Sequence, residues 1–459
     1  MRTFYESLPG PVKAIGGPVA RSLPLRMRYG SAFVSALHEA HRLEWAGPEE
    51  QAAAADAKLR ALSAAAVTSP YWRRVFRDCG VPDGPHDAVG LERLPLISKD
   101  EVAEHTADML TSSSALRKWV TTGGTSGQQL GLWIDKDSSA RDWAYTVNAW
   151  GRVGFRPDSP RVVLRGRALG AHGRDLFEYE PLRRELYVSV FDLDGEHLPA
   201  VRDRLRDVES AFLHGYPSAM LVLARSYVEA GETPPAFRAL LATSEGVHPE
   251  QRQRLEEVFG ARVFSFYGMT EKGAFAAECE CSTQLHVEPG FGIVELLDRG
   301  GNRITEPGLD GEVTVTGLLS CAQPLLRYRT GDFARWASGP CKCGRHARRL
   351  ESVDGRRMQE LLVGRNGAPI PMTGLNMHSR VFDHVRRYMF VQDVPGIAVA
   401  HIEPGAGYGE EDTALILREL GQKLSGQVDL TVELVNRIPT TPRGKARFID
   451  QHLDVSGLL

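Results

Sequence analysis

The sequence predicts an α/β protein with a large N-terminal domain of mostly parallel sheets, a small β-rich subdomain, and a mobile small α+β domain at the C-terminus. Three observations lead to this fold class. Short apolar strands alternate with helical segments between residues 119 and 271, as they do in parallel α/β sheets. After residue 285 the chain changes to short β-rich runs divided by Gly and Pro, and its final part mixes strands with helices. The length of 459 residues suits two or three domains, because one hydrophobic core seldom serves more than about 250–300 residues.

The first half of the chain supplies the alternating elements. Residues 31–67 should be helical, since the Ala-rich run 49–67 contains strong helix formers and few breakers. Further helices are expected at 137–153, 200–229 and 248–259. Strands are expected at 119–120, 161–165, 238–242 and 263–266. This spacing favours a mostly parallel sheet whose ligand-binding loops follow the strand ends.

The β-rich part contains the runs 292–297, 311–316 and 325–328, which predict a distorted antiparallel sheet or barrel. A domain boundary is expected near residues 354–359. We therefore divide the chain into an N-terminal domain, residues 1–355, and a C-terminal domain, residues 356–459.

The composition argues against several classes of partner. Lys and Arg number 55 against 58 Asp and Glu, the formal net charge is −3, and the arginines are dispersed. This balance gives no electrostatic footprint for nucleic acid or an anionic membrane. The N-terminus lacks the apolar core of a signal peptide, and no stretch approaches the ~18 consecutive apolar residues that span a bilayer. We therefore expect a cytoplasmic protein without nucleic-acid or membrane partners, and a homodimer stays open.

The segment VTTGGTSGQ, residues 120–128, is the most informative one in the chain. Its glycines let backbone N–H groups turn inward as an anion-binding nest, and its hydroxyls add donors for phosphate oxygens. On its own, the segment fits a flexible surface turn equally well. It is not a Walker loop, because no Gly-Lys-Ser/Thr follows it.

Four motifs downstream give this loop its meaning. In order, they are Tyr267-Gly-Met-Thr-Glu271, Tyr328-Arg-Thr-Gly-Asp332, Asp354-Gly-Arg356 and Pro442-Arg-Gly-Lys445. With the loop, they resemble the ordered motif series of adenylate-forming ligases. Finer segments resemble the phenylacetate–CoA ligase family, in particular its capsule-biosynthesis and natural-product branch: ATSEG at 242–246, FAAEC at 275–279, GIVEL at 292–296 and PCKCGR at 340–345. The resemblance spans roughly residues 94–450. It implies an ATP-dependent ligase that converts a carboxylic acid into an acyl-AMP and releases pyrophosphate.

The resemblance also implies which residues bind the nucleotide. The β- and γ-phosphates would be held by Thr121, Thr122, Gly123, Gly124, Thr125, Ser126 and Gly127. Tyr267 and Gly268 would face the adenine ring, whose other side would be lined by Ser244, Glu245 and Gly246. Asp332 would accept hydrogen bonds from the ribose hydroxyls, with support from Arg356. Thr270 would contact the α-phosphate, and Glu271 would bind Mg²⁺ through a hard carboxylate oxygen.

Each of these residues also has a structural interpretation. Taken singly, Tyr267 fits a core aromatic, Glu271 a helix-cap carboxylate, and the group Arg327, Arg329 and Asp332 a surface ion-pair set. The functional interpretation gains its weight from the order of the motifs.

Lys445 is the candidate catalytic lysine. In the family that the chain resembles, the matching lysine swings in with the small domain and bridges the acyl carboxylate and the α-phosphate, a role that suits a compact charge on a long stem. The alternative is a solvated basic turn. Two positions depart from the family pattern: Gln128 stands where many relatives carry a lysine, and residues 357–359 lack the usual acidic hinge. Another cation, such as Arg329, could then neutralise the phosphates in place of that lysine.

Two C-x-C pairs and a histidine suggest a metal site. Cys279, His286, Cys341 and Cys343 would supply three thiolates and one imidazole, the closed tetrahedral set of a structural Zn²⁺. Cys281 competes with Cys279, which we favour because the segment before it fits the family pattern. The alternative is a set of reduced residues without metal.

The acid substrate and the acyl acceptor are less defined. The acid pocket is expected around Arg165, Arg167, His214 and Tyr216, a set that suits a polar or additional anionic group on the acid, unless the arginines are structural ion-pair partners. The acceptor is taken as coenzyme A, with an amine or a carrier-protein thiol as alternatives. A different class of function, a catalytically degenerate nucleotide-binding protein, draws support from Gln128 and the altered hinge.

Overall fold

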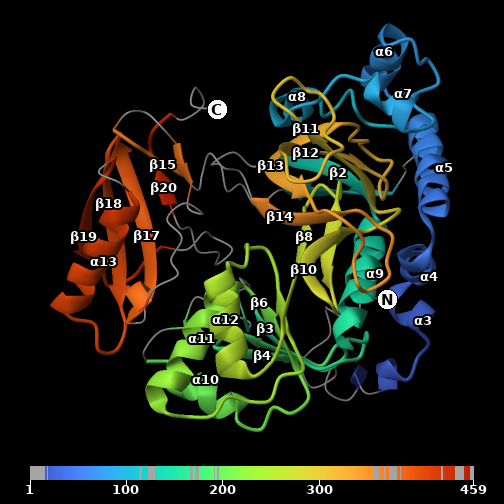
Figure 1. Ribbon diagram of the computed structural model, residues 1–459. Coiled ribbons are helices and arrows are strands. Elements are labelled where there is room, and N and C mark those ends of the chain that lie inside the picture. The colour runs from blue at the N-terminus through green and yellow to red at the C-terminus, as the bar shows by residue number, and fades with distance from the viewer. Residues whose placement is uncertain are drawn as a thin grey trace. The chain divides into compact units, whose positions relative to one another are not determined.

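The computed structural model describes residues 16–17, 19–112, 116–121, 130–165, 169–170, 175–190, 192–193, 196–354, 361–365, 369–371, 380–382, 384–424, 427–439 and 449–454 (Figure 1). The chain forms two compact units. Unit 1 comprises Met1–Ser159, Glu180–Arg184 and Phe264–Asp354, and unit 2 comprises Pro160–Tyr179, Glu185–Val263 and Gly355–Leu459.

Helices make up most of the first part of unit 1. They are α3 (Leu25–Tyr29), α4 (Ser31–Trp45), α5 (Pro48–Ala66), α6 (Pro70–Asp78), α7 (Ala88–Glu92), α8 (Lys99–Glu104) and α9 (Ser138–Trp150), followed by the 3₁₀ turn η1 (Gly151–Val153). Local sequence sets their starts. Ser69 caps α6 by accepting a hydrogen bond from the backbone N–H of Trp72, and Ser98 caps α8 in the same way through Glu101. The helices expected at 31–67 and 137–153 are confirmed.

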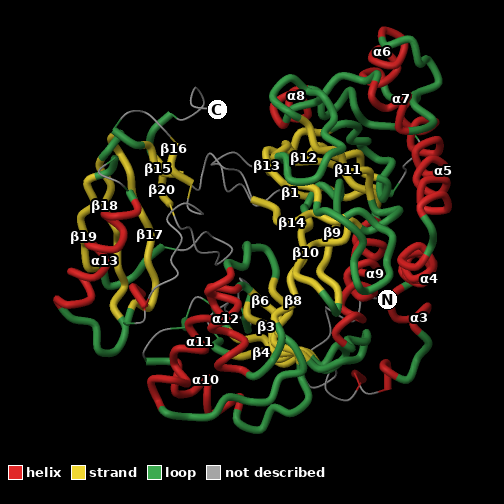
Figure 2. Tube along the Cα trace, in the orientation of Figure 1, coloured by secondary structure: helices red, strands yellow, loops and turns green. Residues whose placement is uncertain are grey.

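The strands of unit 1, which Figure 2 colours yellow, pair antiparallel. A hairpin joins β1 (Arg117–Thr121) to β2 (Gly131–Asp135). The other strands lie in the order β11-β12-β13-β14-β10-β9-β8. Their bounds are β8 (Val263–Gly268), β9 (Phe275–Cys279), β10 (Ser282–Val287), β11 (Gly292–Leu297), β12 (Asp310–Gly317), β13 (Tyr328–Trp336) and β14 (Arg349–Asp354). The expected antiparallel sheet is present, but its third run starts at Tyr328 rather than at residue 325.

Unit 2 contains the parallel part of the fold. Strands β3 (Arg161–Leu164), β5 (Glu185–Val188), β6 (Phe212–Gly215) and β7 (Leu240–Ala242) pair in parallel, with β4 (Phe177–Glu180) beside β5. Helices α10 (Leu198–Leu205), α11 (Pro217–Ala230) and α12 (Pro249–Phe259) share a buried apolar core with these strands. The single helix expected at 200–229 is wrong, because the buried run Phe212–Gly215 forms strand β6 between two shorter helices.

The C-terminal part of unit 2 is a small α+β structure. Its main sheet has the strand order β19-β18-β17-β20, and β15 pairs with β16 in a separate hairpin. The elements are β15 (Leu361–Val363), β16 (Pro369–Pro371), η3 (Arg380–Phe382), β17 (Val385–Val394), β18 (Ile397–Pro404), α13 (Glu410–Lys423), β19 (Asp429–Leu434) and β20 (Ile449–Gln451). Helix α13 covers one face of the main sheet, where Ile416 and Leu420 are buried with Phe390 and Ile402 (Figure 1). The α/β fold class is confirmed. Within the described ranges, no helix is long and apolar enough to cross a membrane.

Candidate functional site

Unit 1 brings two of the nucleotide motifs into direct contact. The hydroxyl of Tyr267, at the end of β8, donates a hydrogen bond of 2.7 Å to Oδ2 of Asp332 on β13. Burial and the nearby Asp332 carboxylate raise the pKa of Tyr267 well above its ordinary value, so this phenol stays protonated and remains the donor. The candidate adenine and ribose residues are therefore in contact, although three strands, β14, β10 and β9, separate β13 from β8 in the sheet order.

A bulge in β13 sets the position of Asp332. The pairing of β12 with β13 changes register between Glu312 and Thr314, and Gly331 has a φ of 73°, which glycine adopts readily. The Thr330 hydroxyl accepts from the backbone N–H of Asp332 at 3.0 Å and donates to the carbonyl of Val313 at 2.7 Å. These bonds fix the backbone from which the Asp332 carboxylate projects.

Glu271 lies in the turn that follows β8. The residue is buried, with 8% exposed, and its Oε1 lies 3.4 Å from the hydroxyl of Tyr328, a residue for which the sequence predicts no separate role. Tyr328 is fully buried at the start of β13. The carboxylate therefore sits in a low-dielectric setting that strengthens its attraction to a cation.

The two arginines near Asp332 have structural partners. Arg327 is buried, pairs with both carboxylate oxygens of Glu295 at 3.1 and 3.2 Å, and donates to the carbonyls of Glu92 and Leu94. Arg329, exposed over 52% of its side chain, donates twice to Oε2 of Glu312. Both arginines are therefore ion-paired, but the expected surface set is wrong for Arg327, which is buried. The structure pairs Arg329 with a carboxylate instead of leaving it as a spare cation.

The acid-pocket and adenine-loop candidates of unit 2 meet at one edge of its parallel strands. Leu164 of β3 lies opposite Gly215 of β6, and Gly215 lies opposite Ala242 of β7. Arg165, Tyr216 and the loop containing Ser244, Glu245 and Gly246 follow directly at the carboxyl ends of these strands, the edge where parallel sheets bind ligands. Ser244 is exposed and has a φ of 68°, a strained value for a non-glycine residue.

His214 occupies the strand interior beside this edge. It is buried, and burial together with the positive charges of Arg161 and Arg165 lowers its pKa well below the ordinary value. The imidazole is therefore neutral near pH 7. Arg161 itself pairs with Glu185, which also accepts a 2.5 Å hydrogen bond from the Tyr187 hydroxyl. At this edge, His214 can recognise a group by hydrogen bonding but not by charge.

Several predicted site residues lie outside the described residues. They are Thr122, Gly123, Gly124, Thr125, Ser126 and Gly127 of the loop, with Arg167, Arg356 and Lys445. Thr121, at the end of β1, pairs with Gly131 at the start of β2, so the two strands hold both ends of the loop.

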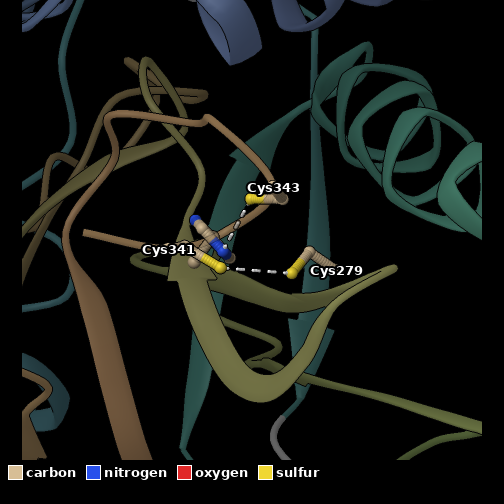
Figure 3. A group of neighbouring side chains, drawn as sticks. Cys279, Cys341 and Cys343 are labelled. Atoms are coloured by element: carbon tan, nitrogen blue, oxygen red, sulfur yellow. Dashed lines mark hydrogen bonds between the residues drawn. The ribbon is translucent and has the colours of Figure 1, made fainter.

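Four side chains form a compact cluster in unit 1 (Figure 3). The ligand atoms of Cys279, His286, Cys341 and Cys343 all lie within 4.8 Å of one another. The Sγ atoms of Cys279 and Cys341 are 3.6 Å apart, as are Cys343 Sγ and His286 Nε2. A tetrahedral Zn²⁺ requires about 3.7–3.8 Å between two thiolates and about 3.5–3.6 Å between thiolate and imidazole. The donor set and its spacing therefore fit Zn²⁺, and Cys281 is exposed beside the cluster.

Charged residues connect this cluster to the N-terminal helices. Arg345, two residues beyond Cys343, donates to Glu44 of α4 at 2.6 Å and to both oxygens of Glu280 at 2.6 and 2.9 Å. Arg152 also donates to Glu44, at 2.8 Å, and pairs with Glu288. This network could not be predicted from the sequence, since no local pattern relates Glu44 to Arg345, three hundred positions later.

Comparison with known proteins shows similarity over most of the chain. No family model matches it. It is 24% identical over 390 residues to Protein CapK of Staphylococcus aureus, covering 83% of this chain and 84% of that protein. It is 25% identical over 354 residues to a phenylacetate-coenzyme A ligase of Pseudomonas putida, covering 72% of this chain and 73% of that protein. Among solved structures, it resembles 2-hydroxyisobutyryl-CoA ligase in complex with R3-HIB-AMP, with a TM-score of 0.69 and 19% identity. The match covers 90% of this chain and 92% of that one. This structural likeness supports the fold.

Proposed function

We propose that this chain, which belongs to the phenylacetate–CoA ligase-like family of adenylate-forming enzymes, activates a carboxylic acid as its acyl-AMP and then transfers the acyl group to coenzyme A. The observation that carries the proposal is the 2.7 Å contact between Tyr267 and Asp332 beside the buried Glu271. Three residues assigned to adenine, ribose and Mg²⁺ thereby share one small region of unit 1. An ordinary core aromatic or a cap carboxylate would not require that arrangement.

Tyr267 and Asp332 would bind the adenosine. The Tyr267 ring offers a flat face to adenine while its hydroxyl orients the Asp332 carboxylate. An ionised carboxylate held this way can accept hydrogen bonds from both ribose hydroxyls. In unit 2, the loop from Ser244 to Gly246 would line the other face of adenine, and Arg356 would support the ribose.

The phosphates would be bound by the loop from Thr121 to Gly127, by Thr270 at the α-phosphate, and by Mg²⁺ at Glu271. The buried carboxylate of Glu271 is a hard oxygen donor and fits this ion. When bound, Mg²⁺ supplies positive charge to the phosphate oxygens, on which negative charge builds as pyrophosphate leaves. Lys445, in the proposed domain 356–459, would neutralise the acyl carboxylate and α-phosphate during adenylation.

The acid would bind near Arg165, Arg167, His214 and Tyr216. Because His214 is neutral, it suits a hydroxyl or other polar substituent on the acid, while Arg165 suits an additional anionic group. The Cys279, His286, Cys341 and Cys343 cluster would hold Zn²⁺ in a structural role, since four protein ligands leave no position open for substrate.

Acid-dependent exchange of pyrophosphate into ATP tests the proposal directly. We expect exchange with at least one acid of a panel that includes aryl, hydroxy and dicarboxylic acids. Lys445→Ala should reduce it by about 10²-fold or more, the scale of one lost charge-stabilising group. Mass spectrometry with coenzyme A, amines or a carrier protein then distinguishes the three acceptors. ATP binding without exchange for any acid would instead identify a degenerate nucleotide-binding protein.

A further inference from the structure

Backbone strain is concentrated near the nucleotide motifs. Among the described residues, those other than glycine with a positive φ are Arg184, Ser210, Ser244, Lys272 and Arg327. Ser244 lies in the adenine loop, Arg327 precedes Tyr328, and Lys272 follows Glu271 directly. Lys272 has a φ of 59°, a left-handed conformation that costs free energy for a residue with a Cβ. Such a conformation persists only where the surroundings enforce it.

The backbone around Lys272 is tightly enclosed. The backbone N–H of Lys272 donates to the carbonyl of Met269 at 3.2 Å and closes the turn. A Cβ placed on Gly273 would lie 2.3 Å from Cγ2 of Val315, and one on Gly292 would lie 1.9 Å from the carbonyl oxygen of Gly273. The backbone just after Lys272 therefore packs closely against β11 and β12, with no room for a side chain at Gly273.

The Lys272 side chain fixes the other side of the turn. Its Nζ lies 2.8 Å from Oδ2 of Asp142 on α9, and 17% of the Lys272 side chain and 26% of the Asp142 side chain are exposed. Partial burial of this pair limits screening by solvent. The same stretch of α9 holds the phosphate-loop hairpin, because Lys118 of β1 donates to the Ser139 hydroxyl at 2.6 Å. Helix α9 is thus bonded to the strand before the loop and to the turn after Glu271.

We propose that Lys272 and Asp142 are positioning residues for the Mg²⁺–nucleotide site. Their ion pair holds the turn in its left-handed conformation, which directs the Glu271 carboxylate, and it connects that turn through α9 to the base of the phosphate loop. This inference rests on the proposed function, because it takes Glu271 as a ligand of Mg²⁺. Neither Lys272 nor Asp142 needs to touch the substrate.

The test measures binding of a non-hydrolysable ATP analogue to the full chain by calorimetry over a range of Mg²⁺ concentrations. The variants are Asp142→Asn, Lys272→Met and the double variant. Each single change should raise the apparent Mg²⁺ dissociation constant by about fivefold to tenfold, and the double change by no more than either single one, because both remove the same pair. Lys272→Arg keeps the charge and should restore most of the wild-type value. Asp310→Asn is the matched control, since it breaks the Arg335–Asp310 pair on the surface of the same unit and should leave the Mg²⁺ dependence unchanged.

Lys272→Gly separates conformation from charge. Glycine adopts the positive φ without strain but removes the ammonium group. If the ion pair acts by holding the left-handed turn, Lys272→Gly should raise the apparent Mg²⁺ dissociation constant less than Lys272→Met does. The proposal would be overturned if Asp142→Asn and Lys272→Met lowered only the melting temperature and left the apparent Mg²⁺ dissociation constant within twofold of the wild-type value. Nucleotide binding that ignores Mg²⁺ in the wild type would also overturn it. Mg²⁺-dependent binding without acid-dependent exchange would instead count against the proposed function alone.

Discussion

Replacing Arg345 by methionine should destabilise unit 1 substantially. The Arg345 side chain is 3% exposed and pairs with Glu44, which is 5% exposed, and with Glu280, which is 44% exposed. Removing one partner of a buried ion pair typically costs about 3–5 kcal/mol, because the remaining charge stays buried. Glu44 keeps Arg152 at 2.8 Å and the amide of Asn148 at 3.0 Å, so we expect about 3 kcal/mol.

Differential scanning fluorimetry and calorimetry measure this effect. For a domain of about 150–250 residues, each kcal/mol lowers the melting temperature by roughly 2–4 °C, so Arg345→Met should lower that of unit 1 by about 6–12 °C. Arg335→Met is the matched control, because its pair with Asp310 is exposed on both sides and should be worth less than about 1 kcal/mol. Metal content is measured on the same samples, and the comparison is made at equal metal content.

A double-mutant cycle completes the test. Arg345→Met leaves the Glu44 carboxylate without one of its partners, and Glu44→Gln removes that charge. The variant that carries both substitutions should therefore be more stable than the sum of the two single effects predicts. A melting temperature for Arg345→Met within about 2 °C of wild type would refute the reasoning, because it would mean that Glu44 is solvated or satisfied without Arg345.

Three further predictions follow from the site. Tyr267→Phe removes the hydrogen bond to Asp332 and should raise the KM for ATP by about tenfold or more with a smaller change in kcat; steady-state kinetics with an unchanged KM would count against the ribose assignment. Cys279→Ser should lower the zinc content of purified protein well below that of Cys281→Ser, measured by plasma mass spectrometry; equal zinc in both variants, or none in the wild type, would contradict the metal centre. The lowered pKa of His214 means that the unfolded chain binds more protons below about pH 6.5, so the stability that His214 contributes is complete above that pH and is lost as the pH falls. In chemical denaturation, His214→Gln should therefore show a shallower loss of stability than wild type as the pH falls below about 6.5, and parallel profiles would contradict the assignment.

The sequence predicted the fold class and most elements because their signals are local. The Ala-rich run before Val67 and the apolar run at Val263 contain the periodicity that specifies them. The helix expected over 200–229 failed because Phe212–Gly215 is a short apolar run, and periodicity alone cannot distinguish a buried strand from a stretch of buried helix.

In the candidate site, too, the residues with a motif could be predicted from the sequence, and their tertiary contacts could not. Motif order placed Tyr267, Glu271 and Asp332 in one site, and the structure brings their side chains to one region. It also brings Cys279 rather than Cys281 into the cysteine cluster. The supporting contacts could not be found, because the partners of Lys272 and Arg345 are Asp142 and Glu44, which lie far away in the sequence. Tertiary packing alone relates such pairs.

Acid-dependent exchange of pyrophosphate into ATP, compared between wild type and Glu271→Gln, tests the central claim most directly. Glutamine keeps the shape of Glu271 but removes the charge that would bind Mg²⁺. The account predicts exchange in the wild type that requires both an acid and Mg²⁺, and a loss of about 10²-fold or more in Glu271→Gln, with melting temperatures that show both proteins to be folded. Undiminished exchange in Glu271→Gln, or no exchange in the wild type with any acid despite bound ATP, would contradict it.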